Sequence, residues 1–84
     1  MQDRQLGELM EAIEAYLACH PEAVDSEEGI ARWWLRSRGL EATAEDVRTA
    51  LQRLIAFRTV RVTHTPDGRS VYGAAPRPPP DRAH

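Results

Sequence analysis

Residues 43–63 read Thr-Ala-Glu-Asp-Val-Arg-Thr-Ala-Leu-Gln-Arg-Leu-Ile-Ala-Phe-Arg-Thr-Val-Arg-Val-Thr, and the period of the apolar residues changes within them. Apolar residues first recur three and four positions apart, at Val47, Ala50, Leu51, Leu54 and Phe57. This spacing predicts a helix that buries one face. Thr43 precedes the helix and Asp46 occupies its third position, so the pair predicts a capped N-terminus.

After this helix the apolar residues alternate with polar ones, as in a half-buried strand. Residues 60–63 read Val-Arg-Val-Thr, which predicts both valines on one face and Arg61 and Thr63 on the other. The Thr-Pro-Asp-Gly sequence at 65–68 is typical of a tight turn. Ser-Val-Tyr at 70–72 then returns as the second strand, so a β-hairpin is predicted.

Two further helices are predicted upstream. The first covers about residues 5–19, and its apolar residues form one stripe, Leu6, Leu9, Met10, Ile13, Tyr16 and Leu17. It is expected to end before Pro21, which disfavours helical geometry at His20.

The second upstream helix is predicted to begin at the Asp-Ser-Glu-Glu sequence of residues 25–28. It runs towards Arg38, with Gly39 as its C-terminal cap. Its apolar residues cover a wider arc than one core-facing stripe requires, so Trp34 is expected in the core and Trp33 half exposed.

Three helices followed by a hairpin resemble the winged-helix family over Leu6 to Tyr72. Residues 47–54 resemble the third helix of bacterial winged-helix regulators, although the glycine that such regulators often place after this helix is replaced by Phe57-Arg58-Thr59. We therefore expect an α+β fold, a three-helix winged helix-turn-helix with a C-terminal β-hairpin wing. It would occupy residues 1–73, with a flexible proline-rich tail at 74–84.

The resemblance implies DNA binding, with the third helix in the major groove and the wing on the backbone. The base-edge candidates are Arg48, Thr49 and Gln52. The phosphate candidates are Arg53, Arg58, Arg61 and Arg69. The expected function is that of a transcriptional regulator or accessory factor on double-stranded DNA.

The alternative is a winged-helix docking module without DNA binding. Trp33 is the candidate interface residue for a protein partner, because aromatic residues often anchor interfaces. A homodimer through the first helix and Trp33 is a further possibility, and the proline-rich tail could occupy a groove that recognises extended proline.

The formal net charge of −2 conceals an uneven distribution. Residues 1–31 hold eight acids against one base, whereas residues 32–84 hold ten arginines against five acids. All eleven bases are arginine, a side chain suited to phosphate but one that genome composition also explains. The arginine-rich part favours an anionic partner.

Other functional classes are disfavoured by the sequence. A chain of 84 residues has little room for both a cofactor site and a substrate site. Cys19 and His20 lack the further ligands of a zinc site, and the remaining histidines share no spacing with them. We therefore expect no enzyme, metal, cofactor or small-molecule substrate. The absence of a long apolar run, a secretory signal and a second cysteine predicts a cytoplasmic protein that does not enter a membrane.

Overall fold

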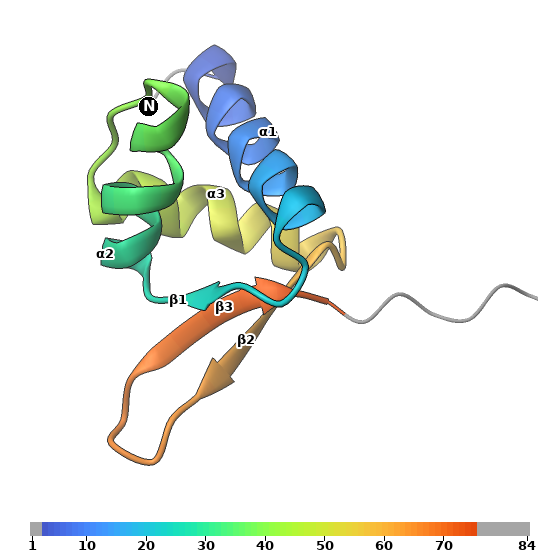
Figure 1. Ribbon diagram of the computed structural model, residues 1–84, viewed down its shortest axis with the longest axis vertical. Helices are drawn as coiled ribbons and strands as arrows, with labels where there is room; N and C mark the ends of the chain where they lie inside the picture. The colour runs from blue at the N-terminus through green and yellow to red at the C-terminus, as the bar shows by residue number, and fades with distance from the viewer. Residues whose placement is uncertain (1–2, 76–84) are drawn as a thin grey trace, which may run out of the picture.

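The computed structural model describes residues 3–75 and has a winged-helix-like α+β topology, as predicted (Figure 1). The helical part consists of α1 (Asp3–Cys19), α2 (Glu27–Gly29), the π-helical turn η1 (Ile30–Trp34), the 3₁₀ turn η2 (Arg36–Arg38) and α3 (Ala44–Ala56). The strands are β1 (Val24–Asp25), β2 (Val60–His64) and β3 (Ser70–Ala74). The predicted proline-rich tail begins at the edge of this range, and from Pro76 onward it lies outside the described residues.

The main core lies between α1 and α3. The buried residues of the two helices are Leu6, Leu9, Ala12, Ile13, Leu17, Val47, Ala50, Leu51 and Leu54. Thr43 and Asp46 form the predicted capping box, in which each side chain accepts a hydrogen bond from the other residue's backbone N–H. The expectation for Phe57 is wrong, because its side chain is 66% exposed. Helix α3 ends at Ala56, so the helical period no longer directs Phe57 into the core.

The second predicted helix is broken into three short pieces. Ser26 caps α2 by accepting a hydrogen bond from the Gly29 N–H. The Leu35 N–H then bonds to the Ile30 carbonyl five residues back, at 3.1 Å, which widens the turn. The wider turn places Trp34 and Leu35 in the core together.

Trp34 stacks on Tyr16 of α1, with ring centroids 4.5 Å apart and planes 11° apart, as the buried member of the tryptophan pair. Trp33 is 64% exposed. The wide apolar arc of the sequence therefore separates into a core side and one solvent-exposed tryptophan. Gly39 ends the segment in the left-handed conformation, with φ at 76°.

The sheet has three antiparallel strands in the order β1-β3-β2, and β1 was not expected from the sequence. Val24 pairs with Gly73 in β3, and Val62 of β2 pairs with Tyr72. Strand β3 extends to Ala74, one residue beyond the predicted domain boundary. The hairpin turn forms as predicted, with a Gly68 N–H to Thr65 carbonyl hydrogen bond of 2.9 Å.

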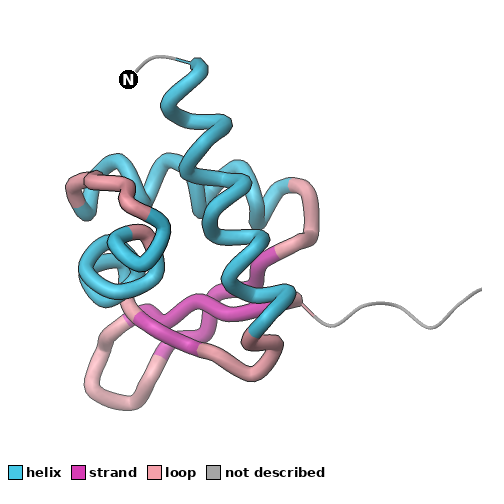
Figure 2. The backbone as a smooth tube through the Cα atoms, turned by 45° about the horizontal axis from the view of Figure 1, so that its top comes forward, coloured by secondary structure: helices cyan, strands magenta, loops and turns pink. Residues whose placement is uncertain are grey.

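The hairpin projects beyond the helices (Figure 1). Val60 at its base is buried, whereas Val62 is 36% exposed, so the two valines predicted on one face of β2 differ in their burial. Figures 1 and 2 show α1 and the α2–η1 segment side by side in front of α3, with the sheet at one end of the helices. This arrangement leaves the polar face of α3 and the hairpin to solvent.

Candidate nucleic-acid interface

A depression of about 610 Å³ lies between the start of α2, the exposed face of α3 and the end of the hairpin. Its lining residues are Ser26, Glu27, Glu28, Ala44, Arg48, Gln52, Arg69, Ser70 and Tyr72. We call it the α3–hairpin depression. It brings together Arg48, Gln52 and Arg69, three of the seven residues that the sequence marked as DNA contacts.

The side chains of Glu27, Arg48 and Tyr72 form a polar cluster in this depression. Arg48 Nε donates to both carboxylate oxygens of Glu27 at 3.2 Å, and its Nη2 donates to Oε1 at 3.1 Å. The Tyr72 hydroxyl donates to Glu27 Oε2 at 2.8 Å. The cluster therefore connects α2, α3 and β3 through one carboxylate.

The protonation states of this cluster follow from its contacts. The Arg48 hydrogen bonds and the Tyr72 hydroxyl lower the pKa of Glu27 against an opposing effect of burial. Burial and the hydrogen bond to Glu27 raise the pKa of Tyr72 to about 12. At neutral pH the cluster therefore consists of an anion, a cation and a neutral hydroxyl donor. The Glu27 side chain is 19% exposed and that of Arg48 is 56% exposed, so Arg48 remains open to solvent.

The other predicted base-edge residues differ in their availability. The Thr49 hydroxyl donates to the Glu45 carbonyl at 3.2 Å, one helical turn back, and the residue is half-buried. Gln52 is exposed, and within residues 3–75 its amide has no hydrogen-bond partner. Arg53 is exposed one position further along α3 but does not line the depression. Gln52 is therefore an exposed side chain of this face whose amide is not engaged by any other described residue.

Arg69 enters the depression from the hairpin. Its Nε lies 3.6 Å from Asp67 Oδ2, in a pair whose side chains are 80% and 65% exposed. The Thr65 hydroxyl hydrogen-bonds to the Asp67 carboxylate and lowers its pKa. An exposed pair of this length holds its guanidinium only weakly, so Arg69 can turn towards a ligand.

Arg61 lies on the other face of the sheet. It pairs with Gly73, whereas Tyr72, the next position of β3, lies on the opposite face and hydrogen-bonds to Glu27 of α2. With Thr63 it lines a separate depression against residues 21–24. The structure therefore places Arg61 outside the α3–hairpin depression.

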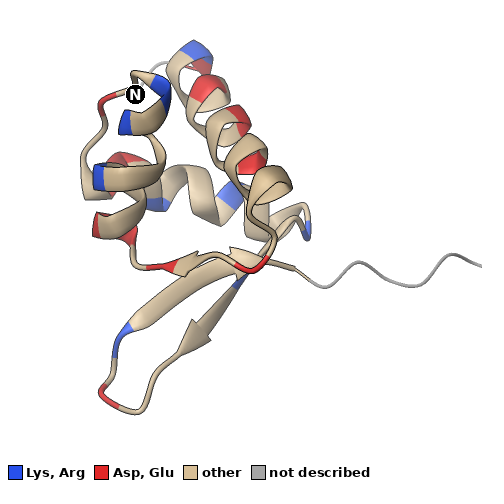
Figure 3. Ribbon diagram, in the orientation of Figure 1, with Lys and Arg blue, Asp and Glu red and all other residues tan. Residues whose placement is uncertain are grey.

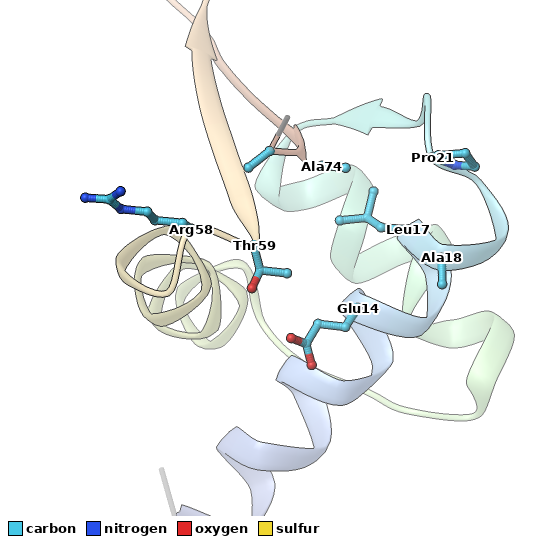
Figure 4. A pocket seen from close by; sticks show the side chains of 8 residues that line it. Glu14, Leu17, Ala18, Pro21, Arg58, Thr59 and Ala74 are labelled. Atoms are coloured by element: carbon cyan, nitrogen blue, oxygen red, sulfur yellow. The ribbon is translucent and has the colours of Figure 1, made fainter. Parts of the chain in front are cut away.

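Arg58 is also separated from the depression. It follows the C-terminal end of α3, beside a cavity of about 740 Å³ whose lining includes Glu14 and Leu17 of α1 and Ala74 of β3. Figure 4 shows its side chain directed away from these three residues. The backbone of Arg58 has a φ of 62°, so this arginine adopts the left-handed conformation that glycine favours.

Two residues of the depression were not singled out as site residues by the sequence. The local sequence indicates only a helix start at Glu27 and a strand at Tyr72. They lie 21 residues before and 24 residues after Arg48, and no local period links the three. Only tertiary packing brings them into contact.

A second surface is formed by the η1–η2 segment, where Trp33 is exposed. Figure 3 shows arginines on this segment and acidic residues along α1.

Within residues 3–75, no group of three His, Cys, Asp or Glu side chains is arranged to hold a metal ion. No helix in this range combines the length and apolarity needed to cross a membrane.

No protein-family model, curated protein or solved structure matches this chain. The fold assignment therefore rests on the observed topology, and the functional argument rests on the side chains themselves. These provide a mixed-charge depression with an exposed amide and two arginines, together with a separate exposed tryptophan.

Proposed function

We propose that this domain binds double-stranded DNA through α3 and the hairpin, as a transcriptional regulator or accessory factor. The observation that carries the proposal is the joint lining of one depression by Arg48, Gln52 and Arg69. A helix that offers an amide and a guanidinium, with a basic hairpin beside it, fits a groove and its flanking backbone.

Each of the three side chains has a distinct chemical part in this proposal. The exposed amide of Gln52 has the donor and acceptor that pair with adenine in the major groove. Arg69 supplies a charge-assisted hydrogen bond to phosphate from the hairpin. Arg48 can contact DNA only when its guanidinium leaves Glu27, because the Glu27 carboxylate already accepts hydrogen bonds from Arg48 Nε and Nη2.

The acidic residues of the depression set the expected strength of binding. Glu27 and Glu28 line it beside Arg48 and Arg69, so its formal charges balance. Phosphate attraction is therefore small, and we expect weak binding with a shallow dependence on salt. Sequence preference would come from Gln52 more than from the total charge.

Fluorescence anisotropy with a labelled 20-base-pair duplex, measured from about 20 to 200 mM salt, tests the proposal. One or two phosphate contacts predict a slope of log K against log salt of about −1 to −2. Arg69→Ala should reduce the magnitude of this slope by about 1, whereas Arg61→Ala, on the other face of the sheet, should leave it unchanged. Lack of binding at the lowest salt concentration would refute the proposal.

A second candidate function is protein docking without DNA binding, favoured by the 64% exposure of Trp33. Trp33 does not line the α3–hairpin depression, so the two candidates use different residues. Loss of protein association in Trp33→Ala, together with absence of DNA binding by the wild type, would favour docking.

A further inference from the structure

The η1–η2 segment presents Trp33 between two exposed arginines, Arg32 and Arg36. Tryptophan and arginine are the residues most enriched among the energetic anchors of protein interfaces. Glu28 and Glu41 line a depression with the two arginines, but neither forms an ion pair with them. Among residues 3–75, neither guanidinium group has an ion-pair partner, so both keep their donors available.

Helix α1 presents the complementary charge. Glu8, Glu11 and Glu14 are exposed and follow one another at three-residue spacing along its outer side. Like charges at this spacing destabilise a helix slightly, and none of the three has an ion-pair partner among residues 3–75. An arginine-bearing surface placed against α1 would relieve this repulsion.

These two surfaces belong to neighbouring elements of the fold. Figures 1 and 2 agree that α1 and the α2–η1 segment run side by side in front of α3. A second copy turned by a two-fold rotation about an axis between them would place its η1 against α1 of the first copy. Its own α1 would then face η1 of the first copy, so both contacts form at once and the assembly closes.

We propose that two copies of this chain form such a two-fold dimer, with η1–η2 of each copy packed on α1 of the other. Trp33 supplies the apolar anchor, a side chain able to bury roughly 150–250 Å². Arg32 and Arg36 pair with the α1 glutamates at the rim. The occupant is a second copy because this chain itself carries both the arginine surface and the acidic surface that complements it.

The dimer is independent of the proposed DNA binding. Trp33, Arg36 and the α1 glutamates do not line the α3–hairpin depression. A dimer that does not bind DNA would refute only the DNA proposal, and a monomer that binds DNA would refute only the dimer.

Sedimentation velocity of the full chain, over protein concentrations of about 5 to 500 µM, provides the first test. We expect a reversible monomer–dimer equilibrium that weakens at least about tenfold between low and high salt, because the rim consists of exposed charges. Trp33→Ala should weaken it by more than about tenfold. Circular dichroism should show an unchanged fold, since Trp33 is 64% exposed.

Charge reversal tests the pairing itself. Arg32→Glu/Arg36→Glu and Glu8→Arg/Glu11→Arg should each remain monomeric, because both contacts of a homodimer would then be repulsive. A one-to-one mixture of these variants should form dimers, since each contact would again join opposite charges. The matched double reversal Arg53→Glu/Arg61→Glu, at exposed positions elsewhere, should dimerise like the wild type.

Three results would each overturn the proposal. The first is a wild type that stays monomeric at the highest concentration in low salt. The second is a mixture of reversed variants that does not associate. The third is a ladder of trimers and larger species, which would indicate open assembly in place of a closed pair.

Discussion

The guanidinium of Arg48 in α3 is held by the carboxylate of Glu27 in α2, with Nη2 and Oε1 3.1 Å apart. The arginine that α3 would offer to a base edge is therefore already bound to an acid of the same chain. Any phosphate or base that uses Arg48 must replace these hydrogen bonds. Glu27 thus opposes the proposed function while it joins α2 to α3 and, through Tyr72, to the sheet.

We predict that Glu27→Gln strengthens DNA binding severalfold at low salt. The substitution keeps the shape and the acceptor for Tyr72, removes one negative charge from the depression and releases Arg48. The salt slope should become steeper by up to about 1, because one more guanidinium meets phosphate. The same anisotropy titration measures both effects.

Glu28→Gln is the matched control for this prediction. It removes the same charge from the same depression, but Glu28 does not bind Arg48. Its effect on DNA affinity should therefore be clearly smaller than that of Glu27→Gln. Equal gains from the two variants would attribute the change to total charge and contradict a specific hold on Arg48.

The Glu27 ion pair also predicts how stability depends on pH. Arg48 and Tyr72 lower the pKa of Glu27 in the folded state below its ordinary value of 4.5. A group with a lowered folded pKa contributes stability that is present above the unfolded pKa and is lost as the pH falls through the folded pKa. Glu27→Gln should therefore be less stable than the wild type by about 0.5–1 kcal/mol at pH 7.

This difference should shrink towards zero as the pH falls below 4.5. Urea unfolding of both proteins between pH 7 and pH 3 measures it. If the difference in unfolding free energy between the wild type and Glu27→Gln stays constant over this range, the Glu27 carboxylate is not the titrating group.

The features that the sequence predicted correctly depend on short-range chemistry. The capping box of Thr43 and Asp46 needs only three residues of spacing, and the turn ending at Gly68 needs only four consecutive residues. The stripe of α1 also follows from one helical period. In each case the structure is determined by residues that lie close together in the chain.

The features that were missed depend on partners distant in the chain. Strand β1 has two residues, too few to show alternation, and it exists because β3 offers an edge at Gly73. The Glu27 contact needs Arg48 and Tyr72 from other elements. The π-helical turn accompanies the burial of both Trp34 and Leu35, and a search for the regular 3.6-residue period does not predict it.

Arg58 provides a test of the departure from the winged-helix pattern at the end of α3. Its φ of 62° lies where a side chain with a Cβ is strained, and its N–H bonds to the Ile55 carbonyl at 2.9 Å. Arg58→Gly should raise the free energy of unfolding by about 1 kcal/mol, because the strain exceeds the added entropy of the unfolded chain.

Arg58→Ala is the control, because it loses the same charge but keeps the Cβ. Its stability should stay within about 0.5 kcal/mol of the wild type. Chemical denaturation of the wild type, Arg58→Gly and Arg58→Ala measures these differences in stability. A gain as large in the alanine variant would indicate that charge, and not the left-handed backbone, limits stability here. DNA affinity should be unchanged in both variants, since Arg58 lies outside the α3–hairpin depression.

Gly73 lies close against Ala23 and Val24, where β1 pairs with β3. A Cβ at this position would lie 3.0 Å from the Ala23 carbonyl oxygen and 3.2 Å from Val24 Cγ2, so β1 would have to move. Gly73→Ala should therefore destabilise the domain by about 1–2 kcal/mol.

Gly7→Ala in α1 is the matched control, since a Cβ there meets no atom within 4 Å. It should stabilise the helix by roughly 0.5–1 kcal/mol. Thermal unfolding compares the two variants, and amide hydrogen exchange at residues 23–25 should increase only in Gly73→Ala. Unchanged exchange there would show that β1 does not depend on its close approach to Gly73.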